Sequence, residues 1–295
     1  MKKIITLILL LSFSVFSFAD ESGEINQQFF EHCFQSDEPG CKIIVQQIIK
    51  NSEKACQAHN AEQCFRLGMA YSGTVYAAVS KNEKKAYQYY KKACDKGHTK
   101  ACTALSKVYM TGQGVKVDYQ KAKQLAEKAC DDGDDLACSN LGFLYKDGKG
   151  VSQDTQKAKE LYQKSCHQNK KNAVACNNLG VLYFKEKNYQ AARPLLEFSC
   201  NQNYLKACYS LATMYADGLG VKQNTKKTVQ LLNKACPSDS PYLAFAEPEA
   251  CFYLGLIYHD GVGIKKDATK AQTFFQIACD LEYTDACHIR NNSEK

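Results

Sequence analysis

A leucine followed four residues later by a tyrosine recurs six times along the chain, and each leucine precedes a small residue. The pairs are Leu67/Tyr71, Leu105/Tyr109, Leu141/Tyr145, Leu179/Tyr183, Leu211/Tyr215 and Leu254/Tyr258. A cysteine lies three residues before each leucine, so apolar residues fall at i, i+3 and i+7, with the small residue at i+4. This spacing describes one face of an α-helix. We expect the small residue to let a neighbouring helix approach closely.

A second helix is predicted after each of these segments. A glycine-rich turn usually comes first, as in 112–115 and 218–221, and glycine suits a turn because it adopts positive φ angles. An Asn or Asp then lies twelve residues before the next cysteine and is a predicted N-cap. These residues are Asn82, Asp118, Asp154, Asn188, Asn224 and Asp267. We call the Leu/Tyr helix of each pair the first helix, and the helix behind the N-cap, such as 120–130 or 156–166, the second helix.

The helix pair is a repeat. The first cysteines of successive pairs, at positions 94, 130, 166, 200 and 236, recur every 34 to 36 residues. One such pair cannot bury its own apolar face, so successive pairs must stack. The predicted fold is therefore all-α, a right-handed α/α solenoid of helix pairs.

The sixteen cysteines predict disulfides that staple successive helix pairs. They fall in consecutive twos, and six of the eight twos are eight positions apart. The twos are Cys33/Cys41, Cys56/Cys64, Cys94/Cys102, Cys130/Cys138, Cys166/Cys176, Cys200/Cys208, Cys236/Cys251 and Cys279/Cys287. A metal site would bring C-x-x-C pairs or clustered histidines, and the sequence has neither, so no metal or cofactor is expected. Each bridge between neighbours would stabilise the fold by about 2–3 kcal/mol.

The N-terminus predicts export. Two lysines precede an apolar run over 4–18, and small residues at Ser17 and Ala19 indicate a signal peptide, 1–19, cleaved after Ala19. The alternative is a retained membrane anchor, for which the run is short. Oxidised cysteines agree with a secreted or periplasmic protein. We expect an N-terminal helical cap over 20–55, about six repeats over 56–287 and a C-terminal tail over 288–295.

The motif at 137–158, A-C-x-x-L-G-x-x-Y-x-x-G-x-G-V-x-x-D-x-x-K-A, resembles the Sel1-like repeat, a relative of the tetratricopeptide repeat. The cysteine pairing is similar to that of the secreted Helicobacter cysteine-rich proteins, and the resemblance covers about residues 56–287. Members of this group are often described as β-lactamases or penicillin-binding proteins, so the resemblance implies such an activity as an alternative function. The sequence contains no S-x-x-K or K-[ST]-G motif and no zinc-type histidine cluster. The motifs therefore predict no catalytic residue.

Binding is the main functional hypothesis. In stacked helix pairs the first helices usually line the concave face, and aromatic and polar side chains there suit a peptide or a helix. The candidate ligand-binding residues are Lys107, Phe143, Lys146, Asn177, Phe184, Tyr209 and Phe252. The expected partner is an extracytoplasmic protein, a peptide or a peptidoglycan-like ligand. Nucleic acid is not expected, because the net charge of +7 is spread over many lysines.

Overall fold

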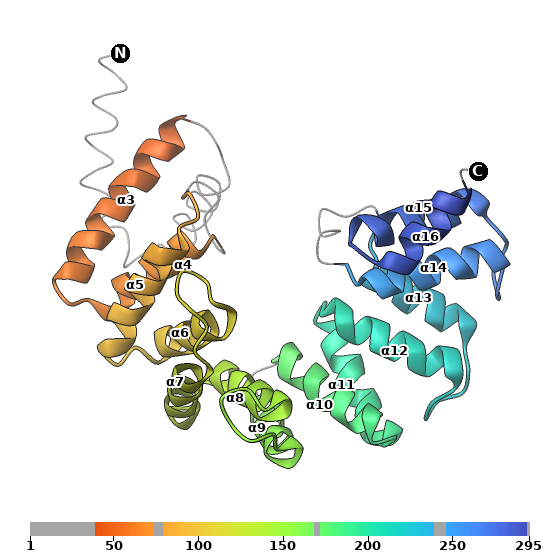
Figure 1. Cartoon of the computed structure of the whole chain (residues 1–295), viewed down its shortest axis with the longest axis horizontal. Coiled ribbons are helices and arrows are strands. Elements are labelled where there is room, and N and C mark those ends of the chain that lie inside the picture. The colour runs from red at the N-terminus through yellow and green to blue at the C-terminus, as the bar shows by residue number, and fades with distance from the viewer. Residues whose placement is uncertain (1–38, 74–78, 168–171, 239–245, 294–295) are drawn as a thin grey trace, which may run out of the picture. The chain divides into compact units, whose positions relative to one another are not determined.

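The computed structural model describes residues 39–73, 79–167, 172–238 and 246–293, and these ranges contain fourteen α-helices and no strand (Figure 1). The helices are α3 (Pro39–Gln57), α4 (Ala61–Ser72), α5 (Glu83–Asp95), α6 (Thr99–Thr111), α7 (Tyr119–Asp131), α8 (Asp135–Asp147), α9 (Thr155–His167), α10 (Ala173–Lys185), α11 (Tyr189–Asn201), α12 (Leu205–Asp217), α13 (Thr225–Ala235), α14 (Pro248–Asp260), α15 (Ala268–Asp280) and α16 (Thr284–Ser293). The predicted signal peptide and Cys33 lie outside the described residues.

The predicted helix pairs are present. The first helices are α4, α6, α8, α10, α12 and α14, and each packs against the second helix that follows it. The chain divides into two compact units, Met1–Asp134 (unit 1) and Asp135–Lys295 (unit 2). Within each unit, the second helix of one pair packs against the first helix of the next pair, which confirms the all-α solenoid. Among the described helices, none is long and apolar enough to cross a membrane.

Both ends of the repeat array are helical. Helix α3 packs against α4 in unit 1 and crosses the boundary that the sequence suggested at residue 55. Helix α16 packs against α15 in unit 2 and runs through Ser293. Most of the segment 288–295, which the sequence analysis treated as a tail, therefore continues a helix.

The small residue of the first helix is a point of close contact with the second helix, as predicted. A Cβ atom added at Gly68 would lie 2.4 Å from a ring carbon of Tyr90 on α5. A Cβ atom at Gly255 would lie 2.5 Å from a ring carbon of Phe275 on α15. Both rings are buried. The absence of a side chain on one helix thus makes room for an aromatic ring on its partner, and this packing builds the core.

The six predicted N-caps of the second helices are confirmed. In each, a side-chain oxygen of the Asn or Asp accepts a hydrogen bond from the backbone N–H three residues further on, at 2.8–3.3 Å. This bond satisfies one of the backbone donors that a helix start leaves free. The second helices therefore begin where the Asn/Asp pattern indicated.

The second glycine of the G-x-G turn has a role that the sequence did not indicate. Gly114 (φ +74°) and Gly220 (φ +67°) both have the left-handed backbone that favours glycine. A Cβ atom on Gly114 would lie 2.3 Å from the backbone of Glu83 at the start of α5, and one on Gly220 would lie 2.4 Å from Cβ of Tyr189 at the start of α11. The turn of one helix pair thus packs directly on the second helix of the pair before it.

Candidate functional site

Disulfides hold the ends of consecutive helices together. Six of the bonds within the described residues have Cα–Cα distances of 4.7–5.2 Å. They are Cys56–Cys64, Cys94–Cys102, Cys166–Cys176, Cys200–Cys208, Cys236–Cys251 and Cys279–Cys287. Cys130 and Cys138 are also disulfide-bonded, and the side chain of Cys41 lies outside the described part. The first helices are thereby held at their N-terminal ends.

This bonding limits the chemistry available to the described part of the chain. None of its cysteines is a free thiol, so none of them can supply the thiolate that a cysteine nucleophile needs. Within the same residues, no three His, Cys, Asp or Glu side chains lie together as metal ligands would.

Tyrosines of the first helices lie between a carboxylate and a lysine. The Tyr215 hydroxyl donates to Oε1 of Glu197 at 3.4 Å, and Nζ of Lys227 lies 4.1 Å from the centre of the Tyr215 ring. Tyr71 has the same surroundings in unit 1, where its hydroxyl donates to Glu53 at 3.4 Å and Nζ of Lys85 lies 4.6 Å from its ring centre. In both cases the lysine also donates a hydrogen bond to the tyrosine hydroxyl, at 2.5 Å for Lys227 and 3.4 Å for Lys85. In this chain a tyrosine beside a carboxylate thus binds a lysine ammonium group, mainly through a charge-assisted hydrogen bond to the hydroxyl.

Two of the predicted ligand-binding residues contact each other on α8. Nζ of Lys146 lies 5.2 Å from the Phe143 ring centre, and Nζ of Lys149 lies 4.8 Å from it. Asp147 forms ion pairs with both lysines, at 2.9 and 3.8 Å. The half-buried Phe143 ring is thus flanked by cations of its own helix and of the turn that follows.

The structure corrects the predicted position of Asn177. Its side chain is only 2% exposed, so it does not lie on an open face. Residues in the same position, directly after the second cysteine of each two, pack toward the start of the next first helix: Phe65 stacks on His98 with ring centres 4.6 Å apart. Asn177 donates from Nδ2 to Oδ1 of Asn178 at 3.4 Å, and its Oδ1 is buried without a hydrogen-bond partner.

The other predicted residues lie at or near the surface. Lys107 is exposed on α6 in unit 1. Phe184 is partly buried and meets Tyr189 edge-on, with ring centres 5.5 Å apart. Tyr209 on α12 and Phe252 on α14 are also partly buried, and both pack against aromatic rings of the helices that follow.

Two tyrosines that the sequence analysis left out complete this aromatic group. Tyr253 on α14 is 45% exposed and stacks on Tyr209, with ring centres 6.1 Å apart. Tyr283, just before α16, lies 5.0 Å from Phe252 by ring centres. All of these rings belong to unit 2: Tyr209 and Tyr253 are carried by α12 and α14, which Figure 1 labels, and Tyr283 directly precedes α16. The sequence did contain a signal for Tyr253. At the position two residues after the second cysteine, the six first helices carry a varied set of residues, and only Tyr253 among them is aromatic.

Acidic residues lie close to these tyrosines. Burial raises the pKa of Tyr209, and Tyr253 and the negative charge of Glu249 raise it further. Burial also raises the pKa of Tyr283, with contributions from Asp285, Tyr253 and Glu249. Both hydroxyls therefore stay protonated at neutral pH, and the Tyr209 hydroxyl is hydrogen-bonded with Tyr253.

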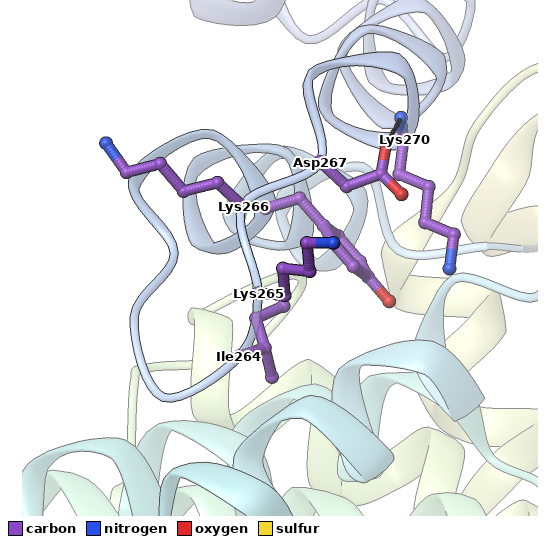
Figure 2. A pocket seen from close by; sticks show the side chains of 6 residues that line it. Ile264, Lys265, Lys266, Asp267 and Lys270 are labelled. Atoms are coloured by element: carbon purple, nitrogen blue, oxygen red, sulfur yellow. Dashed lines mark hydrogen bonds between the residues drawn. The ribbon is translucent and has the colours of Figure 1, made fainter.

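A second surface feature is a pocket of about 510 Å³ beside the turn between α14 and α15, shown in Figure 2. It is lined by Tyr258, Ile264, Lys265, Lys266, Asp267 and Lys270. Asp267 accepts the backbone N–H of Lys270 as a helix cap, and Nζ of Lys270 lies 5.2 Å from the Tyr258 ring centre. In Figure 2 the Lys266 ammonium group points away from Lys265 and Lys270. The three lysines therefore do not converge on one point.

The sequence pattern of the Sel1 repeat matches six segments of the chain, and together they cover most of it. The matched residues are 62–98, 99–134, 135–170, 173–204, 205–236 and 248–283. The chain belongs to the Sel1 repeat family. Each Sel1 match covers one first helix and the second helix that follows, so the helix pair of the structure is the family's repeat.

Solved structures of Sel1 repeat proteins have the same fold. A Sel1 repeat protein from Oxalobacter formigenes is 26% identical, with a TM-score of 0.65 over 75% of this chain and 88% of that one. The protective antigen c5321 of uropathogenic Escherichia coli, described as an SLR fold, is 24% identical, with a TM-score of 0.64 over 81% of this chain. This chain spans 50% of the antigen's length. Comparison with curated proteins finds no significant match.

A Sel1 protein that shares the abundance of cysteines is also similar in sequence. Helicobacter pylori cysteine rich protein B is 30% identical over 47% of this chain and 96% of its own, with a TM-score of 0.36. In this chain the residues directly after the second cysteine of each two vary from repeat to repeat.

Proposed function

We propose that this chain is an exported, disulfide-stapled scaffold whose first helices bind a peptide, a protein or a peptidoglycan-like ligand outside the cytoplasm. The observation that carries the proposal is the aromatic group on α12 and α14, where Tyr253 is 45% exposed although it stacks on Tyr209. Exposed, well-supported tyrosines are typical of the residues that dominate binding interfaces. Abundant disulfides support export, because such bonds persist in oxidising compartments.

The disulfides also support a binding function, because they hold the first helices in place. Each staple holds the start of a first helix against the end of the helix before it, so the exposed side chains are presented on a backbone that is already ordered. A rigid surface loses less conformational entropy on association than a mobile one. The proposed site therefore binds with its aromatic residues already in place.

Site-specific photo-cross-linking tests which face binds. A benzophenone amino acid is placed at Lys107 or Tyr253 on the first helices, and at Glu160 or Gln190 as exposed controls on the second helices. The oxidised protein is then irradiated with an envelope extract of the host cell. The proposal predicts a discrete product from the first-helix positions only. Equal products from both faces, or products from the second helices alone, would contradict it.

The β-lactamase alternative makes a different prediction. It requires a covalent adduct or hydrolysis when the oxidised chain is incubated with a penicillin. Intact mass and hydrolysis, followed together, distinguish the alternative from the scaffold function.

A further inference from the structure

Three tyrosines and three carboxylates gather where α12, α14 and α16 begin. We call them the tyrosine–carboxylate patch: Tyr209, Tyr253, Tyr283, Glu247, Glu249 and Asp285. Ring contacts link Tyr209 to Tyr253, and Phe252 links that pair to Tyr283. The charge of Glu249 acts on the hydroxyls of both Tyr209 and Tyr283, so the acids and the rings form one surface.

The carboxylates of the patch lack cationic partners. Among the described residues, none of Glu247, Glu249 and Asp285 forms an ion pair within 4.0 Å. Lys206 acts on Glu247 from a distance, but burial outweighs it and the pKa of Glu247 is raised. The chain as a whole carries a net charge of +7. The patch is thus a locally acidic, aromatic surface on a basic protein.

The chain itself shows what such a surface binds. Where Tyr215 lies beside Glu197, the ammonium group of Lys227 donates a hydrogen bond to the Tyr215 hydroxyl at 2.5 Å and lies 4.1 Å from the ring centre. The patch also places a tyrosine ring near a carboxylate, because Glu249 lies one helical turn before Tyr253 on α14. In the described part of the chain, no lysine or arginine lies over the rings of Tyr209, Tyr253 or Tyr283.

The patch also departs from the local rule for starting a helix. Asn60, His98 and Asn172 cap the first helices α4, α6 and α10 with a side-chain hydrogen bond. The N-cap residues of α12 and α14 are Tyr204 and Glu247, and neither makes a side-chain cap bond. Two neighbouring first helices thus lack a stabilising cap at the place where the acids and rings collect. Departures of this kind concentrate at functional sites.

We propose that the tyrosine–carboxylate patch binds a lysine- or arginine-bearing segment of a partner peptide or protein. The cation of the partner lies against the exposed Tyr253 ring and the carboxylate of Glu249. Cation–π attraction and charge-assisted hydrogen bonds both favour this pairing. The inference rests on the proposed binding function of the first helices and names the chemistry of their partner.

Fluorescence anisotropy with labelled octalysine and octaglutamate tests the inference on the full oxidised chain. Octalysine is expected to bind, and more weakly at about 500 mM than at about 50 mM NaCl, because salt screens the charges. The double variant Glu249→Gln/Tyr253→Ala is expected to weaken octalysine binding about tenfold or more. The single variant Glu249→Gln, which changes only charge, should weaken it in the same direction with an unchanged circular dichroism spectrum.

A matched double variant, Asp217→Asn/Val262→Ala, removes the same charge and an equally exposed apolar side chain at the other ends of α12 and α14. It should leave octalysine binding within about twofold. Equal losses of octalysine affinity in both double variants would overturn the inference, and so would the absence of octalysine binding. Tighter binding of octaglutamate than of octalysine would also overturn it, because the net positive charge of the chain attracts any acidic peptide non-specifically. A dimer in light scattering that is lost with Tyr253→Ala would also overturn it, because the patch would then face a second copy.

The failure of this inference and the failure of the proposed function give different results. If photo-cross-links form from Lys107 and Tyr253 but Glu249→Gln leaves octalysine binding unchanged, the proposal that the first helices bind a partner stands. The inference that this partner is basic is then wrong. If no first-helix position forms a cross-link, the proposed function itself is wrong.

Discussion

Replacement of Gly220 by alanine tests whether the G-x-G turn is a contact between repeats. The backbone of Gly220 has a φ of +67°, and a Cβ atom there would lie 2.4 Å from Cβ of Tyr189 at the start of α11. Gly218 is in the same turn and has a φ of +70°, but the nearest atom to its added Cβ is a carbonyl oxygen at 3.5 Å. The two glycines thus share the backbone strain and differ in the clash.

The expected energies follow from this difference. A left-handed backbone costs a non-glycine residue about 1–2 kcal/mol, so Gly218→Ala should lower the free energy of unfolding by about that amount. Gly220→Ala has the same cost and must also push the turn away from α11, and overpacking of this kind costs about 1–3 kcal/mol more. We therefore expect Gly220→Ala to be the more destabilising variant by about 1–3 kcal/mol.

Urea unfolding of the oxidised chain, followed by circular dichroism and tyrosine fluorescence, measures both variants. With a slope of about 1–3 kcal/mol per molar urea, the extra loss in Gly220→Ala moves the midpoint by about 1 M. A double-mutant cycle with Tyr189→Gly removes the opposing Cβ atom and should recover much of the extra loss. Equal midpoints for the two alanine variants, or a cycle with no coupling, would refute the idea that the turn packs on the preceding repeat.

Three further outcomes are expected. Tyr215→Phe removes a hydroxyl bonded to a carboxylate and should lower the free energy of unfolding by about 1 kcal/mol in urea unfolding. Tyr145→Phe is the control, because the Tyr145 hydroxyl has no hydrogen bond to any other described residue, and an equal loss there would contradict the assignment. Reduction of the disulfides should lower the urea midpoint, since one nine-residue loop alone stabilises by about 2–3 kcal/mol; an unchanged midpoint would contradict stapling. The hydrogen bond with His98, and secondarily that with Arg66, lowers the pKa of Glu62 below 4.5, so its stabilisation is present above that pH and is lost as the pH falls through the folded-state pKa. Glu62→Gln should therefore flatten the acid side of the stability profile, and an unchanged profile would count against this.

The helix pairs were predictable because the signals that define them are local. The Leu/Tyr spacing, the small residue and the Asn/Asp caps each act within one or two turns of helix, and the structure confirms all three. The position of Asn177 was not predictable in the same way. A helical period shows which residues share a face, but the stacking of neighbours decides whether that face is open. Residues directly after the cysteine meet the next first helix, so Asn177 is buried.

The aromatic site was found only in part for a related reason. Tyr209 and Phe252 were identified by their place on the first helix, whereas Tyr253 lies one position further on and Tyr283 lies at the start of α16. Their association depends on the packing of α12, α14 and α16, which no single segment encodes. The division of the chain into two units was likewise absent from the sequence signals, because the motif continues across Asp134 and Asp135 without a break.

The repeats also distinguish the residues that build the common fold from the residues that differ between one helix pair and the next. Leucine, the small residue, tyrosine and the cysteines return at fixed positions in each repeat, and they are the residues found in the core and the disulfides. The residues at the start of each first helix change from Asn60 to His98, Asn172, Tyr204 and Glu247. Since the fold tolerates each of them, the scaffold does not determine which residue is present. Tyr204 packs against the core of unit 2, so packing accounts for one of the two missing caps. The acids and exposed tyrosine that remain beside Glu247 are the features that a basic partner would suit, as we propose.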